Sequence, residues 1–157
     1  MAVLYRVSGG EARRRRLPGA GKSIWQILMR DVIQLLIDER GVIMENCLFC
    51  KIARKEIPSR VVYEDDEVLV FHDIDPKAPV HVLLIPKVHI TSLNDVSEDN
   101  IEVIAHLTSL IPKVAAMLGI KDNGYRIVIN CGADGGQAVG HIHYHLLGGR
   151  KLAWPPG

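Results

Sequence analysis

The sequence predicts an α+β domain in which an antiparallel sheet of about five strands packs against one long and one short helix. Short apolar runs bounded by turn residues indicate the strands, and two of these runs follow one another so closely that they should pair antiparallel. A long segment with apolar residues at helical spacing indicates the main helix. A third observation is a run of alternating histidines near the C-terminal end, whose spacing is that of a strand.

Composition limits the class of protein. The length of 157 residues suits one domain with or without an extension, and an apolar fraction of 48% is enough for a core. A net charge of +1 gives no overall field that would attract nucleic acid or a membrane surface, so neither partner is expected. No run approaches the roughly 18 apolar residues that span a bilayer. The three cysteines fit a reducing cytoplasm better than a disulfide framework.

The elements follow in order along the chain. We expect strands over 61–63, 68–73, 80–86 and 125–130, and then the histidine strand. The long helix should start at Ser97 as its N-cap and end at Gly119. Pro112 removes one backbone donor inside this helix and should bend it. Its expected inward face consists of Ile101, Ile104, Leu107, Ile111, Val114 and Leu118.

Residues 1–43 are expected to form an extension outside the domain, which then takes in 44–157. Ser23 has the character of an N-cap for a helix over 23–40, and Met44 is an alternative natural start. The basic run Arg13–Arg16 is typical of a solvated tail, and mitochondrial targeting is the alternative. Four acidic residues argue against targeting: Glu11, Asp31, Asp38 and Glu39.

The histidine run carries the strongest chemical signal. His141, His143 and His145 alternate with apolar residues, so a strand places the three rings on one face about 6.5 Å apart. Such a face can be a solvated polar surface, a three-imidazole zinc site, or a nucleophile with two helpers. The preceding glycines favour the third interpretation, because they let backbone N–H groups turn toward a phosphate. These glycines are Gly132, Gly135, Gly136 and Gly140.

A second candidate is the pair Cys47 and Cys50, which has the spacing of half a zinc site. The alternative is two half-buried thiols in a short helix that runs to about Lys55. A redox role is disfavoured because no strand precedes the pair. Cys131 has no partner in the sequence and is expected to be a small buried residue.

These motifs together resemble the histidine triad (HIT) superfamily, and in particular its histidine triad nucleotide-binding (HINT) branch. The resemblance rests on the triad, on Gly135-Gly136-Gln137 before it, and on the endings Leu147-Gly-Gly-Arg150 and Trp154-Pro-Pro-Gly157. It extends from about Cys47 to Gly157. It implies a HIT-like fold whose sheet continues across a homodimer, with the Trp154 tail near the partner's site.

The resemblance also implies an activity. Members of this branch hydrolyse P–N bonds as adenosine 5′-phosphoramidases, so we expect purine nucleoside 5′-phosphoramidates or acyl-adenylates as substrates and nucleoside monophosphate as product. His143 would form a nucleotidyl-histidine, and the main-chain carbonyl of His141 would hold its Nδ1–H tautomer. His145 and the amides near Gly136 and Ala138 would stabilise the phosphoryl oxygens, with Gln137 in the same turn.

Binding residues follow from the same resemblance. Asp73 would accept hydrogen bonds from the ribose hydroxyls, Asn130 would contact ribose or phosphate, and His81 would belong to the polar network of the triad. By their positions alone, Asp73 and Asn130 are equally consistent with turn residues and His81 with a structural histidine. The implied base pocket consists of Leu48, Phe49, Ile52, Phe71 and Ile74, which by spacing alone would be core.

The metal expectation is likewise drawn from the resemblance. Some HIT proteins bind zinc through such a cysteine pair and two histidines, which here would be His89 and His141 beside Cys47 and Cys50. The zinc would be structural, with no cofactor required for the chemistry.

One residue departs from the HINT pattern. Ala138 stands where this branch usually has serine, whose hydroxyl serves the phosphate or the leaving amine. Its absence leaves room for a nucleotide-binding regulatory module with weak activity. A dinucleoside polyphosphate hydrolase and a hydrolase with a triad-bound metal are further alternatives.

Overall fold

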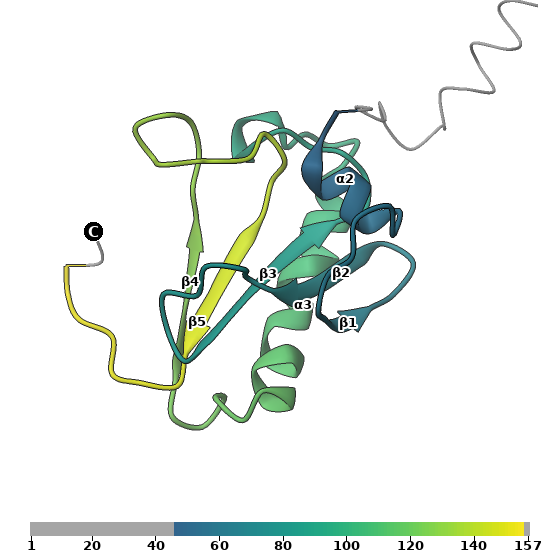
Figure 1. Cartoon of the computed structure of the whole chain (residues 1–157). Helices are drawn as coiled ribbons and strands as arrows, with labels where there is room; N and C mark the ends of the chain where they lie inside the picture. Colours follow the sequence, from purple (N-terminus) through teal and green to yellow (C-terminus); the bar gives the residue numbers. More distant parts are fainter. Residues whose placement is uncertain (1–45, 156–157) are drawn as a thin grey trace, which may run out of the picture. The chain divides into compact units, whose positions relative to one another are not determined.

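The computed structural model describes residues 46–155, so the expectations for the extension over 1–43 and its helix lie outside the described residues. Within the described residues the predicted α+β class is confirmed, with five strands, one long helix and one short helix (Figure 1). The elements are α2 (Leu48–Ala53), β1 (Val61–Glu64), β2 (Val68–His72), β3 (Val80–Pro86), the 3₁₀ turn η1 (Leu93–Asp95), α3 (Ile101–Met117), β4 (Tyr125–Ile129) and β5 (Tyr144–Gly148).

The five strands form one antiparallel sheet in the order β1-β2-β3-β5-β4. The last strand of the chain is therefore inserted between β3 and β4 (Figure 1). In this register His145 lies opposite Leu83 of β3 on one side and Val128 of β4 on the other, and His81 lies opposite Leu147. Because paired residues share a face, His81 and His145 lie on the same face of the sheet.

The two faces of the sheet have different coverings. One face packs against α3 in the larger apolar cluster, to which β2, β3 and β5 contribute Val68, Val70, Val82, Leu84, Tyr144 and Leu146. The other face carries His81 and His145, and only one end of it is covered by α2, through Phe49 and Ile52. The smaller cluster is completed by Leu69, Phe71, Leu83 and Ile85. The uncovered end of this second face is where polar side chains gather.

The start of the long helix differs from the prediction. It begins at Ile101 after Asn100, which makes no side-chain cap hydrogen bond, so the assignment of Ser97 as N-cap was wrong. The reason is a closed turn before the helix. The Asn100 side chain accepts a hydrogen bond from Ser97 N–H (2.8 Å), and Asn100 N–H donates to the Ser97 carbonyl (3.2 Å).

The buried stripe of α3 is close to the expected one. Ile101 is 48% exposed and was wrongly placed in it, and Leu118 is only partly buried. The end of the helix at Gly119 is confirmed: its φ of +69° and the hydrogen bond from Ile120 N–H to the Ala115 carbonyl form a Schellman motif. The buried side chains are Val103, Ile104, Leu107, Leu110, Ile111, Val114 and Ala115.

The histidine run lies only partly in a strand. β5 begins at Tyr144, so His141 and His143 precede the sheet ladder. Their backbone is instead held by other contacts, including a hydrogen bond from Ile142 N–H to the Ile90 carbonyl (2.6 Å). The apolar side of the run is buried as predicted, at Ile142, Tyr144 and Leu146. Within residues 46–155, no helix combines the length and apolar character that crossing a membrane requires.

Candidate active site

His143 is held in a defined tautomer. Its Nδ1 lies 2.7 Å from the main-chain carbonyl oxygen of His141. A carbonyl oxygen only accepts, so Nδ1 carries the proton and the lone pair is on Nε2. The ring is 4% exposed and makes edge contacts with the rings of Phe49 and His145, at centroid distances of 5.1 and 5.0 Å. The contact to His141 is the one that the resemblance implied.

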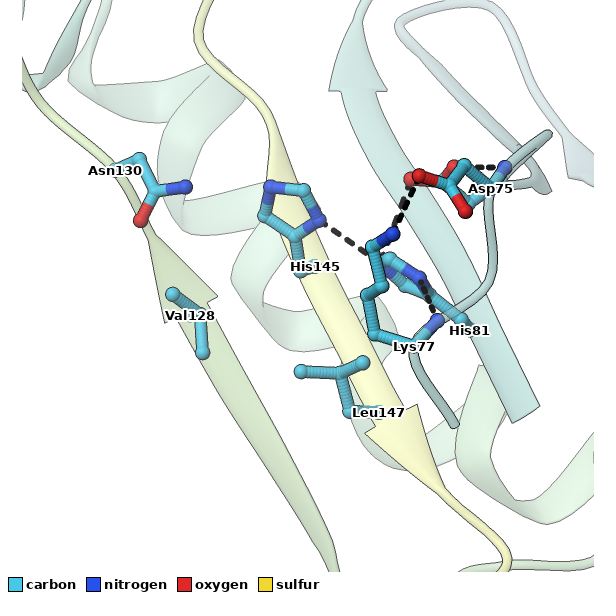
Figure 2. A pocket seen from close by; sticks show the side chains of 8 residues that line it. Asp75, Lys77, His81, Val128, Asn130, His145 and Leu147 are labelled. Atoms are coloured by element: carbon cyan, nitrogen blue, oxygen red, sulfur yellow. Dashed lines mark hydrogen bonds and ion pairs between the residues drawn. The ribbon is translucent and has the colours of Figure 1, made fainter. Parts of the chain in front are cut away.

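A chain of hydrogen bonds sets the tautomer of His145. Lys77 N–H donates to His81 Nδ1 (3.1 Å), so the proton of a neutral His81 ring is on Nε2. That Nε2–H lies 2.9 Å from His145 Nδ1, which therefore accepts (Figure 2). The remaining proton of His145 is on Nε2, a buried atom with no partner among residues 46–155. The series of hydrogen bonds from Lys77 through His81 to His145 thus ends on an N–H donor that no described residue satisfies.

Burial keeps these rings uncharged. It lowers the pKa of His145 to about 4, helped by the neighbouring His143 and His81 and opposed by Asp73. Burial also lowers the pKa of His81, again against the opposing effect of Asp73. Both rings are therefore neutral at pH 7, as the hydrogen-bond chain requires.

Asp73 makes a contact within its own turn and also lies close to His81. Its Oδ1 accepts from Asp75 N–H (2.8 Å), so the predicted turn contact is present. Its Oδ2 lies 3.4 Å from His81 Nε2. Asp73, His81 and His145 are close enough to hold a metal ion. Because His81 Nδ1 already accepts from Lys77, a metal on Nε2 would require an imidazolate, and this geometry favours proton-bearing nitrogens instead.

An open hollow of about 300 Å³ lies over the uncovered end of the sheet (Figure 2). His81 and His145 line it together with Asn130 at the end of β4. Its remaining lining residues are Asp73, Asp75, Lys77, Val128 and Leu147. The hollow therefore brings together four of the residues predicted from separate parts of the sequence, namely Asp73, His81, Asn130 and His145.

The glycine turn is present, but its amides are arranged differently from the expectation. Gly132 and Gly136 both have φ of +72°, a conformation that favours glycine. The N–H of Gly136 donates to the Ala133 carbonyl (2.9 Å), so this amide is engaged within the loop, and a contact of the amides near Gly136 and Ala138 with phosphate stays a prediction. The loop needs this bond to close its turn. Ala138 is exposed, and its N–H has no backbone partner among the described residues.

Gln137 holds the loop together. Its Oε1 accepts from Gly132 N–H (3.0 Å), and its Nε2 donates to the carbonyls of Thr91 (2.7 Å) and Val139 (3.0 Å). Both amide donors and the acceptor of Gln137 are therefore engaged within the protein. In this arrangement Gln137 positions the loop, rather than offering a free group to a ligand.

The apolar residues expected around a base divide into two groups. Phe49, Ile52 and Phe71 are buried in the smaller cluster, as the core alternative predicts. Leu48 is 45% exposed and Ile74 is fully exposed, so neither belongs to the core. Exposed apolar side chains of this kind can line one wall of a binding site.

A second cluster lies on the other side of His141. The ligand atoms of Cys47, Cys50, His89 and His141 lie within 4.8 Å of one another. His141 Nδ1 is 3.5 Å from both sulfurs, and His89 Nδ1 is 3.3 Å from Cys50 Sγ. Donor atoms around a tetrahedral zinc ion with ordinary Zn–S and Zn–N bonds are about 3.5 Å apart. The spacing of this cluster therefore fits zinc.

The tautomer of His141 also suits a metal. Its Nε2 lies 2.9 Å from the Pro86 carbonyl and must donate to it, which leaves the Nδ1 lone pair facing the sulfurs. Burial lowers the pKa of His141 to about 4, and burial with the neighbouring Cys47 raises the pKa of Cys50 to about 12. Burial lowers the pKa of His89 as well. Two neutral imidazoles beside two cysteines, which bind as thiolates, form a typical zinc ligand set.

This arrangement rules out one alternative. His141 points its lone pair at the cysteines, His143 points its Nδ1–H at a carbonyl, and His145 Nδ1 accepts a hydrogen bond from His81. The three triad rings do not converge within the described chain, so a single ion held by all three does not fit.

Some contacts could not be found from sequence. Lys77 acts through its main-chain N–H and Pro86 through its carbonyl, and such groups carry no residue-type signal. Arg150 donates to the Lys77 carbonyl (3.1 Å), which ties the C-terminal segment to the loop after β2. The ending around Arg150 was singled out by the resemblance, but not this contact.

Comparison with known proteins identifies the family. Residues 54–152 match the HIT domain. The chain belongs to the HIT domain family. It is 54% identical over 112 residues to the 14 kDa zinc-binding protein of Zea mays, covering 70% of this chain and 87% of that protein.

Two solved structures are similar to this chain in both fold and sequence. The chain resembles a HIT family hydrolase from Legionella pneumophila, with a TM-score of 0.70 and 54% identity over 71% of this chain and all of that one. It also resembles a histidine triad protein from Clostridium difficile, with a TM-score of 0.68 and 48% identity over 71% of this chain and 96% of that one. The HIT-like fold is therefore confirmed.

Proposed function

We propose that this HIT protein is a hydrolase that acts on purine nucleoside 5′-phosphoramidates or acyl-adenylates through a nucleotidyl-histidine and releases nucleoside monophosphate. The observation that carries the proposal is the pairing of two nitrogens. His143 offers an Nε2 lone pair, and the neighbouring His145 ring, at a centroid distance of 5.0 Å, carries a buried Nε2–H with no partner among residues 46–155. A nucleophile next to an unsatisfied donor suits an electrophile that carries negatively charged oxygens.

The reaction balances in two steps. His143 Nε2 attacks the α-phosphorus, and the P–N bond breaks as its electron pair leaves with the nitrogen, which takes up a proton from solvent. With an acyl-adenylate the P–O bond breaks and carboxylate leaves without that proton. Water then attacks the phosphorus and loses a proton to solvent, the P–Nε2 bond breaks, and its electron pair returns to the imidazole. The His145 N–H stabilises the charge on a phosphoryl oxygen in both steps.

The nucleoside contacts are assigned to the neighbouring loops. Asp73 has one carboxylate oxygen in its turn, and Oδ2 remains for the ribose hydroxyls. Asn130, at the edge of the hollow, serves the ribose or phosphate. The exposed Leu48 and Ile74, over the buried Phe49, Ile52 and Phe71, suit an apolar purine. The loop beside the phosphate is shaped by Gly136, Gln137 and Ala138. Its donor to the phosphate is the main-chain N–H of Ala138, because the N–H of Gly136 is bonded within the loop.

We assign a structural zinc ion to Cys47, Cys50, His89 and His141. The spacing and tautomers of these residues support it, as does the printed name of the Zea mays relative. Zinc there would fasten the start of the domain to the histidine run and take no part in bond breaking. A cytoplasmic location is consistent with three free cysteines.

A homodimer that continues the sheet at β4 completes the proposal. β4 is an edge strand, and all five of its residues are only partly buried. Trp154 is 82% exposed, far more than a tryptophan in an isolated domain usually is, and a partner subunit would cover it. The Trp154 tail would then lie near the partner's site.

The test is turnover of adenosine 5′-phosphoramidate by the wild type and by His143→Ala. We expect AMP release by the wild type, a trappable nucleotide on His143, and loss of at least about 10³-fold in kcat in the variant. Release of AMP by His143→Ala at the wild-type rate contradicts the proposal. Parallel assays with a dinucleoside triphosphate test the alternative substrate class.

A second candidate is a nucleotide-binding regulatory module with weak activity. The observation in its favour is Ala138, which leaves the loop without the expected hydroxyl. AMP binding without turnover or labelling of His143 would favour it.

A further inference from the structure

His141 belongs to two sites at once. Its ring Nδ1 lies 3.5 Å from the sulfurs of Cys47 and Cys50 and forms part of the Cys/His cluster. Its main-chain carbonyl, in the same residue, accepts the Nδ1–H of His143 (2.7 Å). The orientation and tautomer of His143 therefore depend on where the His141 main chain is held.

The His141 ring is fully buried, and its other nitrogen is tied to the Pro86 carbonyl (2.9 Å). The cluster side is weaker when only thiols face Nδ1, because a thiol is a poor hydrogen-bond donor. A bond from a metal to Nδ1 is far stronger and more directional. Of the two ring contacts of His141, the one at Nδ1 is therefore the one whose strength depends on whether the cluster binds a metal.

A second set of contacts connects the cysteine pair with the His143 ring. Phe49, between Cys47 and Cys50 in the sequence, makes edge contacts with the rings of both His141 (5.9 Å) and His143 (5.1 Å). A shift of the cysteine segment would therefore press on His143 directly as well as through His141.

We propose that the Cys47, Cys50, His89 and His141 set, when it binds a metal, positions the nucleophile of this protein. Cys47, Cys50 and His89 are positioning residues that act on His143 through His141 and Phe49. This inference rests on the proposed function for the identity of the nucleophile. It goes beyond a zinc site that only stabilises the fold, because it predicts a change at His143 in a protein that remains folded.

His89 is the residue to change. Its ring packs edge-on against His141 (5.1 Å), its Nδ1 faces Cys50 (3.3 Å), and it contributes no main-chain contact to His143 among the hydrogen bonds of residues 46–155. His89→Ala removes one ligand, and His89→Cys is the matched control because three cysteines and one histidine also form a zinc set. The full chain is loaded with zinc in each case, and bound zinc and melting temperature are measured.

Two readouts follow for each protein. Nitrogen-15 NMR of the histidine rings reports the His143 tautomer, and adenosine 5′-phosphoramidate turnover gives kcat and KM separately. In His89→Ala we expect less bound zinc, a second tautomer or broadened signals at His143, and a fall in kcat of about 10-fold or more with KM within about twofold. In His89→Cys we expect zinc, tautomer and kcat to return to near wild type.

The proposal is overturned if His89→Ala loses zinc yet keeps the wild-type His143 signals and kcat. If His89→Ala does not fold, zinc is removed from the wild type with a chelator and the same signals are followed. Unchanged His143 signals, or loss of the whole fold, overturn specific positioning in that experiment. A wild type without turnover or labelled His143 counts against the proposed function, while the NMR comparison still decides this inference.

Discussion

His141 and His145 flank the same residue and have similarly lowered pKa values, yet their hydrogen-bond partners differ. Burial lowers the pKa of each ring to about 4. His141 donates from Nε2 to a main-chain carbonyl and presents a lone pair to two thiols. His145 accepts at Nδ1 from His81 and presents an unsatisfied N–H.

The difference teaches that hydrogen-bond partners, more than pKa, decide what a buried histidine does. A lone pair directed at sulfur suits a metal, and a buried N–H that still needs an acceptor suits an anion. His143 lies between them and receives its own tautomer from the His141 main chain. If the contacts decide the roles, changes on the His141 side of His143 and changes on its His145 side should have different effects.

The largest effect should come from replacing the two flanking rings separately. His145→Ala removes a donor to the phosphoryl oxygens, so we expect kcat for adenosine 5′-phosphoramidate to fall about 10²–10³-fold with zinc content unchanged. His141→Ala should lower zinc content and the melting temperature, and lower kcat less than His145→Ala does, through the displaced His143 ring. Metal analysis and kinetics on both variants check this. Equal zinc loss in the two would show that the ends are not distinct.

Stability should fall in acid because both rings are buried neutral. Their folded pKa of about 4 lies below the ordinary value of 6.5, so the unfolded chain binds protons first as pH falls. Unfolding free energy should therefore be lost between about pH 6.5 and 4, by at most about 3 kcal/mol per ring. Urea titrations across this range measure it. A matched series on His145→Asn should show a smaller loss, and an identical loss would contradict the assignment to His145.

Ala138→Ser tests the His145 end by adding a donor to the loop beside it. We expect phosphoramidate turnover to rise about 10-fold and acyl-adenylate turnover to change less, because carboxylate is the better leaving group. Steady-state kinetics on the two substrates check this. Ala138→Val is the control for side-chain size, and no gain with serine would show that a hydroxyl there is dispensable.

The smallest effect is expected at Arg150, which supports the His145 end at a distance through the Lys77 carbonyl. Arg150 is exposed, so Arg150→Ala should lower kcat only about twofold. Arg126→Ala is the matched control, because Arg126 donates to the Ala153 carbonyl (2.7 Å) outside the hydrogen-bond chain. A larger fall in Arg126→Ala than in Arg150→Ala would remove the reason to link Arg150 to His81.

Local patterns predicted much of the fold. The strand boundaries agree within about one residue of those expected for β1, β2, β3 and β4, since apolar runs and turn residues act over short distances. The start of α3 was missed because Asn100 and Ser97 hydrogen-bond to each other, and nothing in their spacing distinguishes that turn from an N-cap. The strand expected for the histidine run was cut short because Ile142 bonds to Ile90 outside the ladder.

By itself, the sequence determined the α+β class, the alternation that buries Ile142, Tyr144 and Leu146, and which residue types were present for nucleophile, zinc and turn. Only the tertiary structure decided which ring has which partner. His81 reaches His145, and His89 reaches Cys50, across 64 and 39 positions of the chain. Periodicity describes neighbours along the chain, whereas a tautomer is set by whichever donor or acceptor the folded chain brings to each nitrogen.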